Sequence, residues 1–196
     1  MLQAMMHMGN SGRGSHEEAL TASRRIYETR EILAETVSLS AGSECCIYSK
    51  LYRGIKYCNT GLVGPGEHVV TTDLEHNSVL RPLYRLEQEK GIRLSFAEAD
   101  TRGCIDYDRL ELLVKDNAKA IVCTHGSNLT GNLVDIARVG KIADTYGALF
   151  ILDASQTAGV FPIDMEEMHI DVLCFTGHKS LFGPQGTGGL AVCGNL

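Results

Sequence analysis

The sequence has 196 residues, of which 44% are hydrophobic and 21% charged, proportions typical of a folded globular protein rather than a disordered chain. A formal net charge of −6 argues against a nucleic-acid partner, and the apolar runs are too short to span a membrane. The seven cysteines lack CxxC spacing and the N-terminus lacks a basic leader. This pattern excludes a simple disulfide framework or zinc ribbon and favours a reducing, cytoplasmic location.

Helices and apolar strands alternate along the chain. Ser15 and Glu18 form an S-x-x-E capping pattern that predicts the start of a helix over residues 15–37. Gly91 and Gly147 predict the ends of two later helices. The other predicted helices cover 77–90, 106–114 and 135–146, and the predicted strands cover 68–71, 92–96, 118–124, 148–152, 172–175 and 189–192.

This alternation indicates the fold class. Continuously apolar strands separated by longer helices are typical of βαβ units. The sequence therefore predicts an α/β fold with a mainly parallel sheet and helices on both faces, a three-layer α/β/α arrangement. In such sheets the ligand binds where the strands end, at their carboxyl edge.

Polar residues follow four of the predicted strands, in segments 73–77, 125–131, 153–156 and 176–179. Singly they are weak evidence, because an aspartate after a strand commonly caps a helix and an isolated histidine or lysine is commonly structural or solvated. Four such loops at one edge of one sheet predict a binding site.

Lys179 and Asp153 indicate which chemistry this site could perform. The amine of Lys179, in a glycine-framed loop, can form a Schiff base with an aldehyde cofactor. Pyridoxal phosphate is such a cofactor, and it needs a carboxylate at its pyridine nitrogen, which Asp153 can supply. Thr176 and His178 can hold its phosphate, and His76 can stack on its ring.

Three stretches resemble the class V aminotransferase family, most closely its cysteine desulfurase and selenocysteine lyase-like branch. They are HVVTTDLEHNSVLRP at 68–82, DASQTAG at 153–159 and TGHKSLFGPQGTGGL at 176–190. The resemblance covers residues 9–43 and 61–196, and its most specific feature is DxxQ followed by HK. It implies the type I pyridoxal-phosphate transferase fold, with a large α/β domain, a small C-terminal domain and a homodimer.

The resemblance also implies roles for individual side chains. Lys179 is implied to form the Schiff base with pyridoxal 5'-phosphate and to move the α-proton of the substrate, and His76 to stack on the ring. The other implied cofactor-binding residues are Asp153 at the pyridine nitrogen, Gln156 at the phenolic oxygen, Thr176 and His178 at the phosphate, and Asn128 near the phenolic oxygen and the substrate carboxylate. No metal ligands are implied.

The reaction implied by the resemblance removes sulfur from L-cysteine to leave L-alanine. A cysteine outside this chain would take the sulfur and pass it to a sulfur-acceptor protein. Two alternatives stay open: a class V aminotransferase or β-eliminating lyase acting on another amino acid, and an inactive truncated or pseudogene product. Because the chain stops at Leu196, we expect a truncated arm over 1–14, a partial large domain over 15–196, no small domain and little turnover.

Residues 44–60 depart from the family although both flanking segments match it. The family has a strand here, followed by a T-x-N-x-T-E-A-L-N-like turn whose backbone N–H groups bind the cofactor phosphate. Synonymous codons can be chosen for 44–60 that, read one nucleotide later, give SVVYTANCTEALNTAIR, which is such a strand and turn. We hypothesise a pair of compensating frameshifts in this segment; the alternative is a divergent loop.

Overall fold

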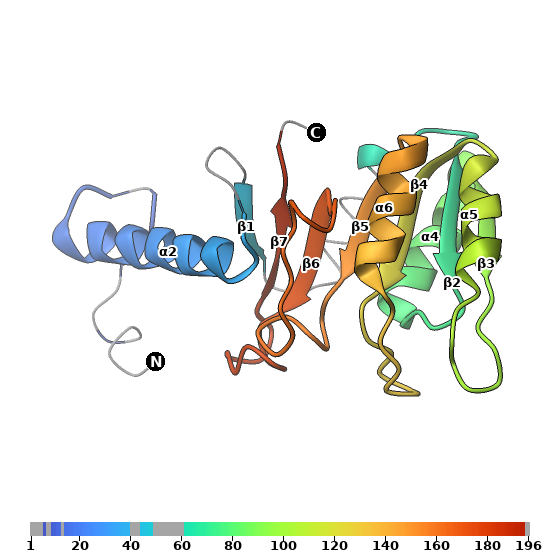
Figure 1. Cartoon of the computed structure of the whole chain (residues 1–196). Coiled ribbons are helices and arrows are strands. Elements are labelled where there is room, and N and C mark those ends of the chain that lie inside the picture. The colour runs from blue at the N-terminus through green and yellow to red at the C-terminus, as the bar shows by residue number, and fades with distance from the viewer. Residues whose placement is uncertain (1–5, 7–8, 13, 40–43, 49–60, 195–196) are drawn as a thin grey trace.

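The computed structural model describes residues 6, 9–12, 14–39, 44–48 and 61–194. Their centre is a seven-stranded sheet with the strand order β1-β7-β6-β5-β4-β2-β3 (Figure 1). Only β7 runs antiparallel to its neighbours in this sheet, and the remaining pairs are parallel. The strands are β1 (Glu44–Tyr48), β2 (His68–Thr72), β3 (Arg93–Ala97), β4 (Ala118–Thr124), β5 (Leu149–Asp153), β6 (Val172–Thr176) and β7 (Gly188–Val192).

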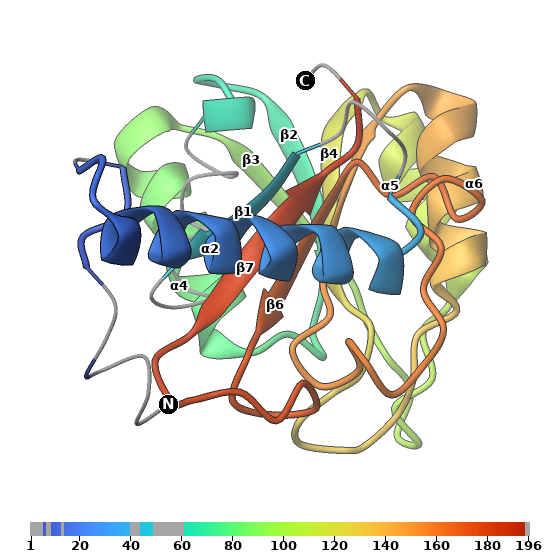
Figure 2. The same ribbon diagram turned by 90° about the vertical axis from the view of Figure 1, so that its left-hand side faces the viewer.

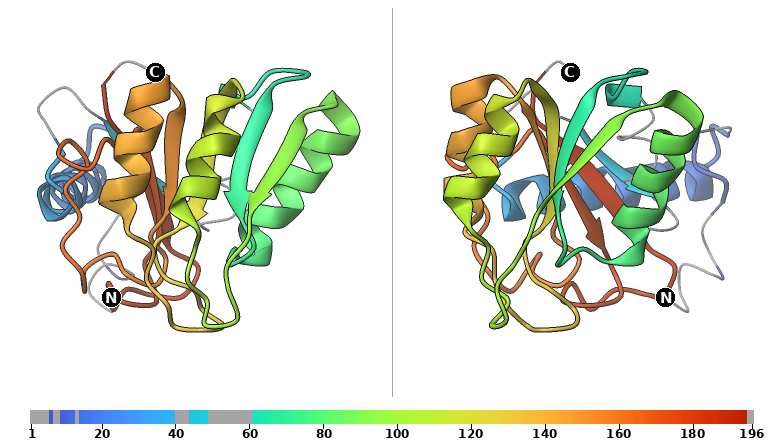
Figure 3. Two further views of the ribbon diagram at one scale, coloured as in Figure 1. Left: turned by 45° about the vertical axis from the view of Figure 1, so that its right-hand side comes forward. Right: turned by 90° about the vertical axis from the view of Figure 1, so that its right-hand side faces the viewer.

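Helices flank the sheet on both faces, as predicted. Figure 3 shows α5 and α6 side by side on one face and α4 on the other, and Figure 2 shows α2 lying across the β1 end of the sheet. In the described part of the chain, no helix is long and apolar enough to cross a lipid bilayer. The bounds are α2 (Glu17–Thr36), α4 (Asn77–Lys90), α5 (Tyr107–Lys115) and α6 (Ile136–Tyr146).

Two apolar cores hold these layers together, one on each face of the sheet. Successive strand residues point to opposite faces, so β4 contributes Ile121 and Cys123 to the core under α5 and α6, and Ala120 and Val122 to the core under α4. All four side chains are at most 1% exposed. Burial on both faces explains why the strands are continuously apolar instead of alternating with polar residues.

All of the predicted helices and strands are present, with ends that differ by at most two residues. The predicted cap of the first helix is wrong: His16, not Ser15, caps α2. Its Nδ1 accepts a hydrogen bond from the backbone N–H of Ala19 at 3.3 Å and lies 3.1 Å from the carboxylate of Glu18. An imidazole nitrogen can accept this bond as a hydroxyl oxygen does, so the helix starts later than the S-x-x-E pattern predicts.

Strand β1 lies within the segment that departs from the family pattern. It pairs antiparallel with β7, from Glu44 opposite Val192 to Tyr48 opposite Gly188. We predicted no strand from the residues present here. Residues 49–60, where the family has its phosphate-binding turn, lie outside the described residues, and the frameshift hypothesis stays a prediction.

Gly140 offers a test of the packing of α6. A Cβ atom at this buried position would collide with the backbone carbonyl of Met168, which cannot rotate away. We expect Gly140→Ala to lower the free energy of unfolding by about 1–3 kcal/mol, although alanine favours helices over glycine by about 1 kcal/mol. Urea unfolding measures this change. Lys141→Ala, at an exposed neighbour in α6, should change it by less than about 0.5 kcal/mol; equal effects of the two substitutions would contradict this account.

Candidate active site

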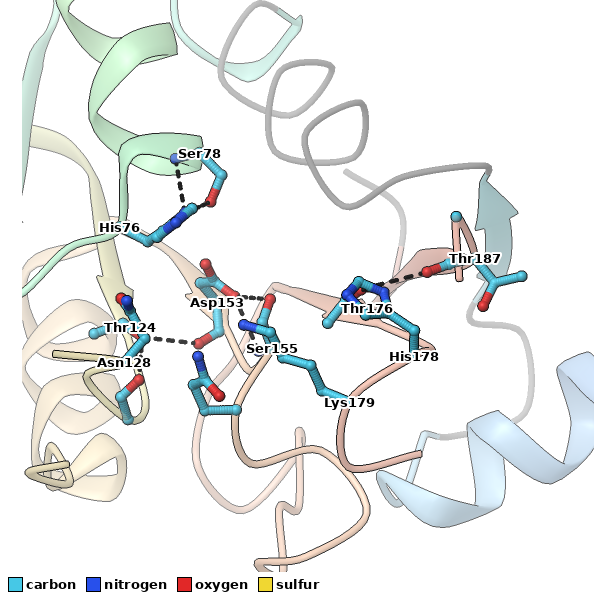
Figure 4. A pocket seen from close by; sticks show the side chains of 13 residues that line it. His76, Ser78, Thr124, Asn128, Asp153, Ser155, Thr176, His178, Lys179 and Thr187 are labelled. Atoms are coloured by element: carbon cyan, nitrogen blue, oxygen red, sulfur yellow. Dashed lines mark hydrogen bonds between the residues drawn. The ribbon is translucent and has the colours of Figure 1, made fainter. Parts of the chain in front are cut away.

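A cavity of about 400 Å³ opens at the carboxyl edge of the sheet. It lies where β4, β5 and β6 end, at Thr124, Asp153 and Thr176, and beside the start of α4. Figure 4 shows side chains from these separate loops turned toward one common space. The cavity is lined by all seven side chains singled out in the sequence, namely His76, Asn128, Asp153, Gln156, Thr176, His178 and Lys179.

Asp153 is a buried acid in this cavity, with 3% of the residue exposed. Both the backbone N–H and the hydroxyl of Ser155 donate hydrogen bonds to its Oδ1. Burial raises the pKa of the Asp153 carboxyl, and the bonds from Ser155 and the positive charges of Lys179 and His76 oppose that rise. Among the described residues, no cationic group forms a salt bridge with this carboxyl. The site can therefore accommodate a positively charged ligand atom here.

His76 is the N-cap of α4, and this role fixes its ring. Its Nδ1 accepts a hydrogen bond from the backbone N–H of Ser78 at 3.1 Å and lies 2.8 Å from the Ser78 hydroxyl (Figure 4). Because Nδ1 accepts, the proton of the neutral imidazole belongs on Nε2. The ring is thus held at the wall of the cavity by the start of the helix.

The loop from β6 to β7 brings a hydroxyl, an imidazole and glycine backbone together. Thr176 Oγ1 lies 2.9 Å from His178 Nδ1, and the N–H of Gly177 donates to the carbonyl of Thr187 at 2.9 Å. A Cβ atom at Gly177 would collide with the Thr187 hydroxyl, so a larger residue here would require the Thr187 side chain to move. The hydroxyl of Thr176 and the imidazole of His178 are side chains that can donate hydrogen bonds to an anionic group.

Three further side chains in the cavity lining are available to bind a ligand. Within the described residues, the amine of Lys179 and the side-chain amides of Gln156 and Asn128 form no hydrogen bond. An amine and two amides at one cavity can therefore bind a ligand without first breaking a bond to the protein.

Several further polar residues belong to the site. Thr124, Ser155 and Thr187 line the cavity with hydroxyl groups, and Glu75 lies buried next to His76. The position of Ser155, two residues after an aspartate at a strand end, is the signal of an Asx turn. Glu75 lies in the predicted loop 73–77, but nothing in the sequence indicates its burial, because a glutamate after a strand is usually exposed.

The family model described as Aminotransferase class-V matches residues 1–195. The chain belongs to this family, which confirms the resemblance seen in the sequence. A probable cysteine desulfurase from Methanothermobacter thermautotrophicus is 34% identical over 180 residues, covering 91% of this chain and 44% of that protein. Another from Pyrococcus abyssi is 31% identical over 191 residues, covering 96% and 47%.

Solved structures of cysteine desulfurases have the same fold as this chain. The apo structure of a cysteine desulfurase from Thermococcus onnurineus NA1 matches with a TM-score of 0.90 and 32% identity, over 98% of this chain and 50% of that one. The cysteine desulfurase CsdA from Escherichia coli matches with a TM-score of 0.83 and 25% identity, over 97% and 49%. The expected transferase fold is confirmed, and the chain spans about half the length of the relatives it matches.

The buried acid Asp153 predicts a pH-dependent stability. Its folded pKa is raised, so its contribution to stability is fully present below its ordinary pKa of 3.8 and is lost as the pH rises through the folded value. Asn keeps the acceptor for Ser155 but cannot ionise. We therefore expect Asp153→Asn to raise the melting temperature relative to the parent, and more at about pH 7.5 than at about pH 4.

Thermal unfolding at the two pH values measures this effect. Asp108→Asn is the control, because that side chain is 87% exposed, and its difference from the parent should be small at both pH values. An Asp153→Asn variant less stable than the parent at both pH values would mean that a partner stabilises the charged carboxylate.

Proposed function

We propose that this chain is the cofactor-binding part of a pyridoxal 5'-phosphate-dependent cysteine desulfurase. The observation that carries the proposal is the convergence of Lys179, Asp153 and His76 on one cavity, in a chain whose relatives are named cysteine desulfurases. The activity is proposed for the complete protein, since the chain spans about half of those relatives.

The cavity residues fit the cofactor. Asp153, buried and without a salt bridge in the described part of the chain, would pair with a protonated pyridine nitrogen. His76, held by Ser78, would stack on the ring. The turn that contains Thr176 and His178 would hold the phosphate. Each cofactor group thus has a partner of complementary charge or shape.

We assign the remaining roles to Lys179, Gln156 and Asn128, whose side chains form no hydrogen bond within the described residues. When bound, the cofactor supplies an electron sink for the carbon next to the substrate amine. The Nζ atom of Lys179 would hold the cofactor aldehyde carbon and move the α-proton of the substrate. Gln156 would bind the phenolic oxygen, and Asn128 would orient the substrate carboxylate.

L-cysteine is the proposed substrate. Its C–S bond breaks, alanine leaves, and the sulfur forms a persulfide on a cysteine thiol of the enzyme. As the family resemblance implies, this cysteine lies outside the present chain. We also propose a homodimer, a cytoplasmic location and transfer of the sulfur to an acceptor protein, which are the assignments that the family resemblance implies.

We further infer that residues 44–60 are a frameshifted reading of the family segment. The alternative frame supplies T-A-N-C-T-E-A-L-N, the hydroxyl-rich turn that binds phosphate at a helix N-terminus. In support, β1 pairs with β7 at the start of this segment, and the family has a strand at this place.

Uptake of the cofactor tests the proposed function. Adding pyridoxal 5'-phosphate to the purified chain should produce a visible absorbance band, and borohydride should fix the cofactor on Lys179, as detected by peptide mass spectrometry. Lys179→Ala should lose both signals, because Lys179 is the one lysine among the described residues that line the cavity. The control Lys119→Ala, at an exposed lysine of β4, should keep both. A folded parent without either signal would refute the proposal.

The frameshift hypothesis has its own test. Replacing residues 44–60 by SVVYTANCTEALNTAIR should strengthen binding of pyridoxal 5'-phosphate by about tenfold or more, a gain of about 1.4 kcal/mol from restored phosphate contacts. A titration followed by absorbance measures the change. Resequencing the coding DNA across this segment is the direct check, and DNA that does not encode the family turn when read one nucleotide later would contradict the hypothesis.

A further inference from the structure

Glu75 is a buried carboxyl that joins two strands beneath the cavity. It lies between β2 and α4 and is 9% exposed. Its Oε1 accepts a hydrogen bond from the hydroxyl of Thr72 at 2.7 Å and another from the backbone N–H of Thr124 at 2.8 Å. Thr72 ends β2 and Thr124 ends β4, and these strands are neighbours. One oxygen atom therefore connects the carboxyl ends of both.

The second oxygen of Glu75 favours a neutral acid. Its Oε2 is buried and has no hydrogen-bond partner among the described residues. A negative charge on this atom would be unsolvated, which is costly in a protein interior. A proton placed on Oε2 removes that charge and leaves Oε1 as the acceptor of both bonds.

The negative charges around Glu75 also favour its neutral form. Burial raises the pKa of Glu75 to about 8, and the carboxyls of Asp153 and Asp73 add to the rise, while the bonds from Thr72 and Thr124 oppose it. The thiol of Cys123 on β4 also faces this group, and its own pKa is raised by burial and by both Glu75 and Asp153. At neutral pH the glutamate is therefore mostly protonated.

The contacts of Glu75 lead directly to the cavity. His76 is the next residue, and Thr124 lines the cavity itself. The hydroxyl of Thr124 donates to the carbonyl of Gly126 at 3.0 Å and lies 3.4 Å from the carbonyl of Asp153. A shift of Glu75 would thus be transmitted to the ring of His76 and to the strand end that carries Asp153.

Resting on the function proposed above, we propose that Glu75 is a positioning residue which, as a neutral acid, ties β2 to β4 and so holds His76 and Thr124 against the cofactor ring. A neutral Glu75 adds no second negative charge near Asp153, whose own charge is one of the causes that raise the pKa of Glu75. Two neighbouring carboxyls in one interior do not both ionise readily.

The test compares variants of the chain by titration with pyridoxal 5'-phosphate between about pH 6.5 and 9. Gln is neutral at every pH and keeps the Oε1 acceptor, so Glu75→Gln should bind like the parent at the lower end. Above the pKa of Glu75, about 8, the parent should weaken relative to the Gln variant by about tenfold. Glu75→Ala should bind about tenfold more weakly than the Gln variant throughout.

Glu87→Gln is the matched control, because Glu87 is an exposed glutamate on α4, and its affinity relative to the parent should not change with pH. An Ala variant that binds like the parent would overturn the positioning role and leave the proposed function intact. If the Ala variant does not fold, identical pH profiles of the parent and the Gln variant would overturn it. A folded parent that takes up no cofactor would refute the proposed function itself, and this inference with it.

Discussion

The in-register pairing of the parallel strands is the constraint on which the site depends. Thr124 pairs with Asp153, so β4 and β5 end at the same level, and Asp153 pairs with Cys174, so β6 ends two residues further on, at Thr176. A slip of one residue would turn every side chain of a strand to the opposite face. The close packing of both cores opposes such a slip, because each apolar side chain would enter the opposite core, which its shape does not fit. Ordinary hydrophobic packing thus fixes the position of the polar site.

Burying the carboxyls of the site costs free energy of folding, and the hydrophobic cores offset this cost. Asp153 and Glu75 are both buried at the carboxyl edge of the sheet, and burial raises the pKa of each carboxyl. The large cores can tolerate this cost, which an isolated loop could not. Carboxyls are usually exposed to water. Buried carboxyls are expected where a ligand binds, because the ligand supplies the missing charge or hydrogen-bond donor.

Much of this arrangement could be predicted from the sequence. Runs such as Ala120 to Cys123 identify buried strands, and polar residues directly after them identify the site. Three features could not be predicted. The cap at His16 depends on a rotamer, the burial of Glu75 depends on strands distant in sequence, and β1 lies in a segment whose residues do not follow the family pattern. Contacts between segments distant in sequence decide the last two features, whereas the cap depends on the side-chain conformation of one residue.

The antiparallel direction of β7 has a consequence for the lysine. Because β6 and β7 are adjacent and antiparallel, with Thr176 opposite Gly188, the loop that carries Lys179 leaves and re-enters the sheet through one pair of hydrogen-bonded strands. A parallel crossover would instead have joined the lysine to a helix that can shift independently. The loop that carries Lys179 is thereby anchored at both ends by hydrogen-bonded strands, and the flexible methylene chain of Lys179 gives its amine freedom beyond the backbone.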